Sequence, residues 1–154
     1  MSMPVLVTLV ALSGAGKSEV FDRVITKYPH FSPMNTYTSR LPRFEGEGGY
    51  EFHSKDFFKK HQKEFVELAT YPPHSDPKEE NIHYYGKHKS QFDGQNYIMT
   101  MDEVGVQTLD KIISRGKLKG YKILKLFVDC DDEVRLQRIN HDKKRMGRDA
   151  KRKL

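Results

Sequence analysis

Cysteine is almost absent from this sequence of 154 residues, and long hydrophobic runs are missing. Cys130 is the single cysteine, which excludes an internal disulfide framework of the kind that small secreted proteins use. The longest apolar run, Val5 to Leu12, is interrupted by Thr8 and is far shorter than the ~20 residues of a membrane-spanning helix. No basic and apolar leader with a small-residue cleavage site is visible. We therefore expect a cytoplasmic protein without a membrane span.

Positive charge is concentrated at one end of the chain. The sequence has 27 basic and 21 acidic residues, which gives a formal net charge of +6. Residues 138–154 contain eight Lys or Arg against Asp142 and Asp149, so residues 1–137 are formally neutral. The basic end is expected to attract anions, and phosphate is the expected partner. Nucleic acid is an alternative, but no aromatic side chain stands between Lys143 and Lys153 to stack on bases, so such a contact would be non-specific.

Strand patterns alternate with helix patterns near the start of the sequence and again in its second half. The apolar segment Val5–Val10 predicts a central parallel strand, and Ser18–Tyr28 has apolar side chains at helical spacing. Further strands are predicted at Tyr97–Met101 and Ile123–Val128, with a helix at Val104–Ser114 between them. Strand, helix and strand in that order imply a parallel crossover.

The middle of the chain has weaker patterns. Residues 31–50 are rich in Pro, Gly, Thr and Arg and indicate a loop with short irregular strands. Ser54 is a suitable N-cap for a helix that we expect to carry Phe57, Phe58 and later Phe65. The segment from Tyr71 to Asn81 has three prolines and predicts an exposed loop. A last helix is predicted to begin at Asp132, before the basic end.

A glycine-rich turn joins the first predicted strand to the first helix. Residues 11–18, Ala-Leu-Ser-Gly-Ala-Gly-Lys-Ser, match the P-loop pattern except that Ala11 replaces its first glycine. In this pattern backbone N–H groups surround a phosphate at a helix N-terminus, the lysine reaches the terminal phosphates, and the hydroxyl binds Mg²⁺. The residues predicted to bind the ATP phosphates are Ser13, Gly14, Ala15, Gly16, Lys17 and Ser18, with Ser18 also the metal ligand.

Five further segments, in the same order along the chain, resemble motifs of guanylate kinases. They are Thr36–Arg43, Gly48–Phe52, Glu64–Glu67, His83–Gly86 and Met101–Gly105. The resemblance runs from Val5 to about Arg138 and implies ATP-dependent phosphorylation of GMP or dGMP with Mg²⁺. It implies an α/β fold: a three-layer P-loop NTPase core with a small parallel sheet, a monophosphate-binding subdomain and a short basic lid. In a single domain over residues 1–154, we assign 1–30 and 93–137 to the core, 31–92 to the subdomain, and 138–154 to the lid.

The resemblance also implies roles for individual residues on the acceptor side. Paired arginines can hold a phosphate dianion bidentately, and phenols add hydrogen bonds. Guanine presents two adjacent donors that one carboxylate can accept, whereas adenine presents an acceptor there and is repelled. The implied phosphate clamp is Arg40, Arg43, Tyr50 and Tyr85, and the implied guanine contacts are Thr36, Glu67 and Asp102.

The expected mechanism is direct in-line transfer, in which the protein positions the reactants and stabilises charge. Lys17 and mobile arginines would hold the transferred group. Arg138 matches the first lid arginine of the family, and Arg145 and Arg148 are candidates for the others, with a solvated basic tail as the alternative for those two.

Three departures from the family pattern leave alternatives open. Lys87 stands where the family has a serine or threonine that contacts guanine, so it could donate to the guanine carbonyl or adapt the site to another base. Thr100 replaces an aspartate, which leaves Mg²⁺ held by Ser18, phosphate oxygens and water. The family also continues beyond the length seen here. A kinase of another nucleoside monophosphate or of a phosphorylated sugar, and an inactive nucleotide- or protein-binding module, remain alternatives. The intact Gly16-Lys17-Ser18 argues against a protein-binding module.

Overall fold

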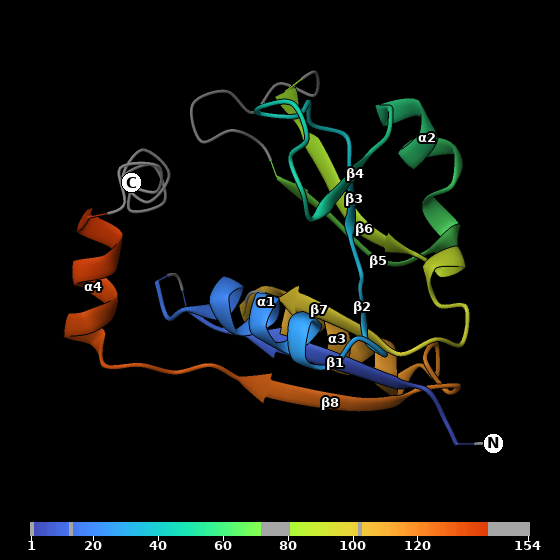
Figure 1. Cartoon of the computed structure of the whole chain (residues 1–154). Helices are drawn as coiled ribbons and strands as arrows, with labels where there is room; N and C mark the ends of the chain where they lie inside the picture. Colours follow the sequence, from blue (N-terminus) through green and yellow to red (C-terminus); the bar gives the residue numbers. More distant parts are fainter. Residues whose placement is uncertain (1, 13, 72–80, 102, 142–154) are drawn as a thin grey trace.

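Two four-stranded sheets form the framework of the protein, one above the other in Figure 1. The computed structural model describes residues 2–12, 14–71, 81–101 and 103–141. The first sheet is fully parallel and has the order β2-β7-β1-β8, with β1 at Val5–Val10, β2 at Ser32–Pro33, β7 at Tyr97–Met101 and β8 at Lys122–Phe127. The second has the order β4-β3-β6-β5, with β3 at Thr36–Thr38, β4 at Tyr50–Phe52, β5 at Phe65–Tyr71 and β6 at His83–His88.

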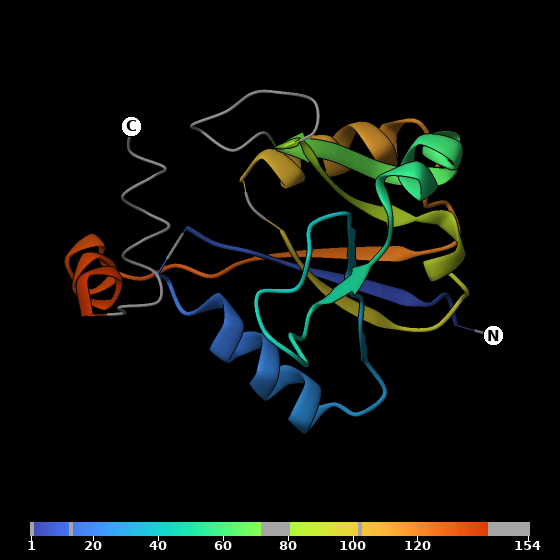
Figure 2. The ribbon, with the colours of Figure 1, turned by 90° about the horizontal axis from the view of Figure 1, so that it is seen from above.

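The first sheet is covered by one helix on each face. Helix α1 (Lys17–Lys27) packs its apolar side chains on Val7 and Leu9 of β1, which point to one side. Helix α3 (Glu103–Ser114) packs on the opposite side, where Leu6 and Val10 lie. Figures 1 and 2 show α1 and α3 on opposite sides of the strands. Burial of both faces of β1 explains its continuous apolar run. The helix on each face of the sheet confirms the predicted mixed α/β arrangement in three layers.

The strands and helices predicted for the first sheet and its covering layers agree closely with the structure. The strand Tyr97–Met101 is confirmed at both ends, and the strand predicted at Ile123–Val128 begins and ends one residue earlier. The crossover is parallel as expected, and β1 lies between β7 and β8, in agreement with its prediction as a central strand. Helix α4 (Asp132–His141) follows β8 and lies at one end of the molecule (Figures 1 and 2).

The second sheet contains the main correction to the predicted elements. Ser54 caps helix α2 (Lys55–Lys60) as expected, because its Oγ accepts a hydrogen bond from Phe57 N at 3.1 Å. The helix does not continue to Phe65. It ends at Lys60 with His61 as its C-cap, a short 3-10 helix η1 follows at Gln62–Glu64, and Phe65 begins β5. Phe65 stacks on Phe58 at a ring separation of 5.0 Å, so the aromatic spacing that suggested one helix joins a helix to a strand.

A β-bulge in β5 determines which side chains share a face of the second sheet. Phe65 pairs with His88 and Glu67 pairs with Lys87, so Val66 is the extra residue. In a regular strand Glu67 would lie on the same face as Phe65, two residues earlier. The bulge instead places Glu67 beside Lys87, and Val66 packs against the hydrophobic cluster under α3. The two sheets are therefore linked through the side chain of Val66.

None of the helices in the described part of the chain is both long enough and apolar enough to cross a membrane.

Candidate functional site

The predicted phosphate-binding turn lies at the carboxyl end of β1, directly before α1. Gly16 has a φ of 96° and forms the N-cap of α1, so the helix begins at Lys17 with its first backbone N–H groups unpaired within the helix. The Lys17 ammonium donates to the Met101 carbonyl at 3.1 Å, which brings it over the end of the neighbouring strand β7. Ala11 is buried and does not have a positive φ, so this position does not require the glycine of the usual pattern.

Helix α4 packs directly against this turn. The Arg138 guanidinium donates from Nη1 to the Gly14 carbonyl at 3.3 Å. A Cβ atom at Gly14 would lie 2.8 Å from the Arg135 carbonyl oxygen and 2.9 Å from the Ile139 side chain, so only glycine allows this approach. The structure thus brings together Lys17 and Arg138 around one turn, from opposite ends of the described chain.

Arg40 of the predicted phosphate clamp is buried in a two-pronged ion pair with Glu47. Its Nη2 and Nη1 atoms lie 2.6 Å and 2.9 Å from the two carboxylate oxygens, and the two side chains are only 8% and 7% exposed. The hydrogen bonds from Arg40 lower the pKa of the Glu47 carboxyl to about 2, and Glu47 in turn raises the pKa of Arg40. Glu47 is not among the site residues predicted from the sequence. An acidic residue four positions after Arg43, in the arginine-rich loop, is the signal that indicates such a pair.

The aromatic members of the clamp lie beside Arg40. Its guanidinium carbon stands 4.4 Å from the centre of the Tyr50 ring, and the Tyr50 and Tyr85 rings meet edge to face at 6.4 Å. Arg43 contributes differently: its side chain is exposed and its backbone N–H donates to Glu47 at 2.8 Å. The Arg40 Nε is buried and has no hydrogen-bond partner among the described residues, so one donor of the guanidinium is unsatisfied inside the protein.

Thr36, Glu67 and Lys87, the predicted base contacts, also come together. The buried Lys87 ammonium donates to Thr36 Oγ1 at 2.8 Å and to the Met34 carbonyl at 2.9 Å. Glu67 is its cross-strand partner on the same face of the sheet. Burial lowers the pKa of Lys87 to about 8, and the nearby Glu67 charge partly opposes that shift. An ammonium has three donors, so one remains for Glu67 or for a ligand.

A small cavity lies between this group and the core under α3. Val66, Glu67 and Lys87 line one side of it, and Met99 and Leu109 are among the core residues on the other. Its volume of about 10 Å³ is close to the minimum for one water molecule. A purine is larger than this cavity.

The remaining predicted site residues are less informative. Ser18 is exposed in the first turn of α1. Four predicted site residues lie outside the described part of the chain: Ser13, Asp102, Arg145 and Arg148. The same holds for residues 72–80 of the predicted exposed loop.

Comparison with known proteins gives a likeness among solved structures. No protein-family model matches the sequence, and no curated protein matches it. Among solved structures, the chain is similar to a guanylate kinase from Anaplasma phagocytophilum, with 16% sequence identity and a TM-score of 0.49. The superposition covers 91% of this chain and 85% of that chain.

Proposed function

We propose that this protein transfers the γ-phosphoryl group of ATP to GMP or dGMP, with Mg²⁺, to give GDP or dGDP. The observation that carries the proposal is the turn between β1 and α1. There a left-handed Gly16 starts the helix, Lys17 is the first helical residue, and Arg138 contacts the same turn. Helix N-termini bind anions, and parallel sheets bind ligands at the carboxyl ends of their strands.

The donor side of the proposed reaction needs positive charge around the transferred group. Lys17 and Arg138 supply two such charges within one small region. Transfer between phosphates requires little covalent work from the protein, so we assign both residues to charge stabilisation and positioning. Arg145 and Arg148 are proposed to add to this charge from the lid.

The metal would bind through oxygen atoms. Mg²⁺ keeps several waters and takes one or two protein oxygens together with substrate phosphates, so the exposed Ser18 hydroxyl beside the turn fits this requirement. The ion would neutralise charge on the phosphates of bound ATP. Lys17 then has the separate task of orienting the terminal phosphate.

The acceptor side needs a site for a phosphate dianion. Arg40 offers a buried Nε donor without a partner in the described chain, and the Tyr50 and Tyr85 rings lie next to it. Two tyrosines and an arginine with a free donor fit a phosphate monoester. Arg43, whose side chain is exposed, is proposed to complete the clamp from solvent.

The choice of base is assigned to Glu67, Thr36, Lys87 and Asp102. A carboxylate that accepts both guanine donors repels the adenine ring nitrogen, and unpaired polar groups can discriminate by several powers of ten. The Lys87 ammonium provides a donor for a carbonyl oxygen, which guanine has and adenine lacks. Because cytosine, uracil and thymine also have carbonyl oxygens, the buried lysine favours one second candidate, a kinase for a different nucleoside monophosphate.

A substrate panel tests the proposal directly. ATP consumption by the full chain with Mg²⁺ is measured with GMP, dGMP, AMP, CMP, UMP, dTMP and a sugar phosphate, and products are identified by chromatography. GDP or dGDP formation well above that of the other diphosphates supports the proposal. A preference for a pyrimidine or a sugar phosphate refutes the guanine assignment, and no phosphorylation of any acceptor refutes the enzyme and leaves a binding module.

A further inference from the structure

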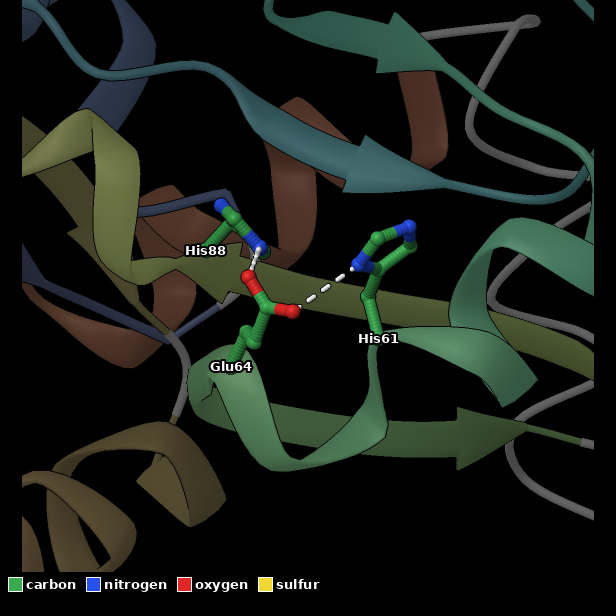
Figure 3. Close-up of side chains that lie close together, drawn as sticks. All are labelled: His61, Glu64 and His88. Atoms are coloured by element: carbon green, nitrogen blue, oxygen red, sulfur yellow. Dashed lines mark hydrogen bonds and ion pairs between the residues drawn. The ribbon is translucent and has the colours of Figure 1, made fainter.

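Two histidines and one glutamate meet near α2, at the opposite end of the structure from the phosphate-binding turn (Figure 1). His61 Nδ1 lies 3.0 Å from Glu64 Oε1, and His88 Nε2 lies 3.3 Å from Glu64 Oε2. Figure 3 shows both imidazole rings directed at the same carboxylate. The three candidate ligand atoms all lie within 4.8 Å of one another. None of these residues takes part in the proposed phosphoryl transfer.

Local structure explains why the three residues converge. His61 is the C-cap of α2, and Glu64 ends η1 three residues later, so their side chains lie on one side of a tight turn. His88 ends β6 and pairs with Phe65, the residue directly after Glu64. The ladder between β5 and β6 therefore fixes the distance between a helical segment and a strand end that are 24 positions apart in sequence.

The His88 side chain is the strongest indication of a ligand. It is only 10% exposed, and its buried Nε2 makes no hydrogen bond of acceptable geometry within the described chain, although Glu64 Oε2 is near. Its Nδ1 is 2.7 Å from Ser90 Oγ. If Nδ1–H donates to that hydroxyl, Nε2 presents a lone pair to a carboxylate, and a cation bound between the two would satisfy both acceptors.

The competing explanation for the close approach of His88 and Glu64 places the ring proton on the other nitrogen of His88. The Ser90 N–H lies 3.3 Å from Nδ1, and if it donates there, a neutral ring carries its proton on Nε2, facing Glu64. The Ser90 N–H contact is longer than the contact to the Ser90 hydroxyl. In this alternative a proton rather than a metal ion stands between His88 and Glu64.

The chemistry of the three ligands selects a metal. Two imidazole nitrogens and one carboxylate oxygen, with a fourth position open to water, form a common zinc set. Zinc bonds of 2.0–2.1 Å in a tetrahedron put ligand atoms about 3.3 Å apart. The His61 and His88 nitrogens lie 3.0 Å and 3.3 Å from the two different oxygens of the Glu64 carboxylate, so both are within reach of an ion held there. Mg²⁺ prefers oxygen ligands alone and is not expected to bind.

One neighbouring charge opposes a cation at this place. Lys89 Nζ lies 3.3 Å from Glu64 Oε2, but its side chain is 64% exposed and can turn to solvent. Aromatic rings keep the imidazoles in place: Phe57 lies 4.7 Å from His61 and Phe65 lies 5.1 Å from His88.

We propose that His61, Glu64 and His88 bind one Zn²⁺ ion, which ties the end of α2 to the end of β6. The ion would join two segments of the second sheet region, and its ligands lie apart from Lys17 and Arg138. The proposal does not depend on the kinase assignment. A protein without kinase activity would bind zinc equally well.

Calorimetric titration tests the site. The full chain, without an affinity tag and freed of metal with a chelator, is titrated with zinc chloride and separately with magnesium chloride. We expect one zinc per chain and no binding of magnesium. His61→Gln and Glu64→Gln each remove one partly exposed ligand, and each should weaken zinc binding at least about 100-fold, the upper range for losing only an outer-shell contact.

Matched variants separate this site from other zinc ligands of the chain. His53 and Glu51 form a comparable pair at 3.1 Å without a second histidine, so His53→Gln should leave the affinity unchanged. Cys130→Ser should also leave it unchanged. Zinc at 100 times its dissociation constant should raise the melting temperature of the wild type by about 5–10 °C and should not raise that of Glu64→Gln.

The outcomes are distinguishable. The His88→Gln variant removes a buried ring and can fail to fold. The His61→Gln and Glu64→Gln variants, which change partly exposed side chains, therefore decide the question. Absence of zinc binding by the wild type overturns the proposal and supports the proton-shared arrangement. Equal zinc affinity of the wild type, His61→Gln and Glu64→Gln also overturns it, since the ion then binds elsewhere.

Discussion

Lys87 donates a hydrogen bond to Thr36 at 2.8 Å, inside the protein rather than at its surface. Both residues were assigned to base recognition from the sequence, and the structure brings them together with Glu67 on the next strand. An ammonium that is only 3% exposed is costly when charged, because it has lost most of its water. Two hydrogen bonds and one neighbouring carboxylate offset part of that cost.

The first prediction concerns stability at alkaline pH. Lys87 titrates near pH 8 in the folded protein and near 10.5 when unfolded, so between these values the unfolded state holds more protons. Stability should therefore rise with pH across this window, by up to about 3 kcal/mol, and the penalty should be complete below pH 8. Urea unfolding of the wild type and of Lys87→Met at several pH values measures the difference.

The free energy of unfolding of Lys87→Met has to be subtracted from that of the wild type at each pH, because tyrosines titrate in a similar pH range. Burial raises the pKa of Tyr97 to about 12, so this residue lowers stability as pH rises above about 10 in both proteins. The contribution of Lys87 is the part that Lys87→Met lacks. A difference between the two proteins that stays constant from pH 7 to 10 would contradict a depressed lysine pKa.

The second prediction concerns the choice of base. Glu67→Gln keeps the shape of the side chain but replaces one acceptor oxygen with a donor, so it should no longer accept both guanine donors. We expect the ratio of kcat/KM for GMP over AMP to fall about 10- to 1,000-fold, mostly through KM for GMP. Glu51→Gln, an exposed glutamate on β4, is the control and should leave the ratio unchanged. An unaltered ratio in Glu67→Gln would remove this residue from base recognition.

The sequence predicted the parallel core well because its elements are encoded locally. The apolar run of β1, the glycine turn and the spacing of α1 are each visible within about ten residues, and burial on both faces follows from the run itself. The bulge at Val66 is different. It has no local signal, and it alone moves Glu67 from the Phe65 face to the Lys87 face.

The sequence predicts which residues belong to the candidate site better than it predicts the contacts between them. Thr36, Glu67 and Lys87 were all named from the resemblance, yet that Lys87 would be buried and bonded to Thr36 depends on packing between strands. The ion pair of Arg40 with Glu47 is likewise a product of how the loop between β3 and β4 folds back. His61 and His88 carry no motif, and only the pairing of β5 with β6 brings them together.

The third prediction concerns the phosphate-binding turn. Lys17→Ala removes the ammonium that we assign to the terminal phosphate, and kcat should fall at least about 100-fold because the charge acts on the transition state. Folding should change little, since Lys17 is a helical position where alanine is favourable. Lys27→Ala, at the other end of the same helix, is the matched control and should retain wild-type kcat. Wild-type activity in Lys17→Ala would refute the assignment of the turn.

The fourth prediction concerns the buried pair of Arg40 and Glu47. Because the hydrogen bonds from Arg40 hold the pKa of Glu47 near 2, below its usual 4.5, the unfolded state binds the proton first as pH falls. The stabilisation by this pair is therefore complete above about pH 4.5 and is lost between pH 4.5 and 2. Glu47→Gln should destabilise the protein by about 2 kcal/mol at pH 7, as expected for a charged hydrogen bond.

The pH dependence separates this ion pair from a packing effect of the substitution. The stability difference between the wild type and Glu47→Gln should shrink as pH falls from 4.5 toward 2, since the wild-type carboxyl also becomes neutral. Glu45→Gln, in the same loop and exposed, should match the wild type at every pH. A deficit in Glu47→Gln that is the same at pH 7 and pH 3 would show that the side chain contributes through shape rather than charge.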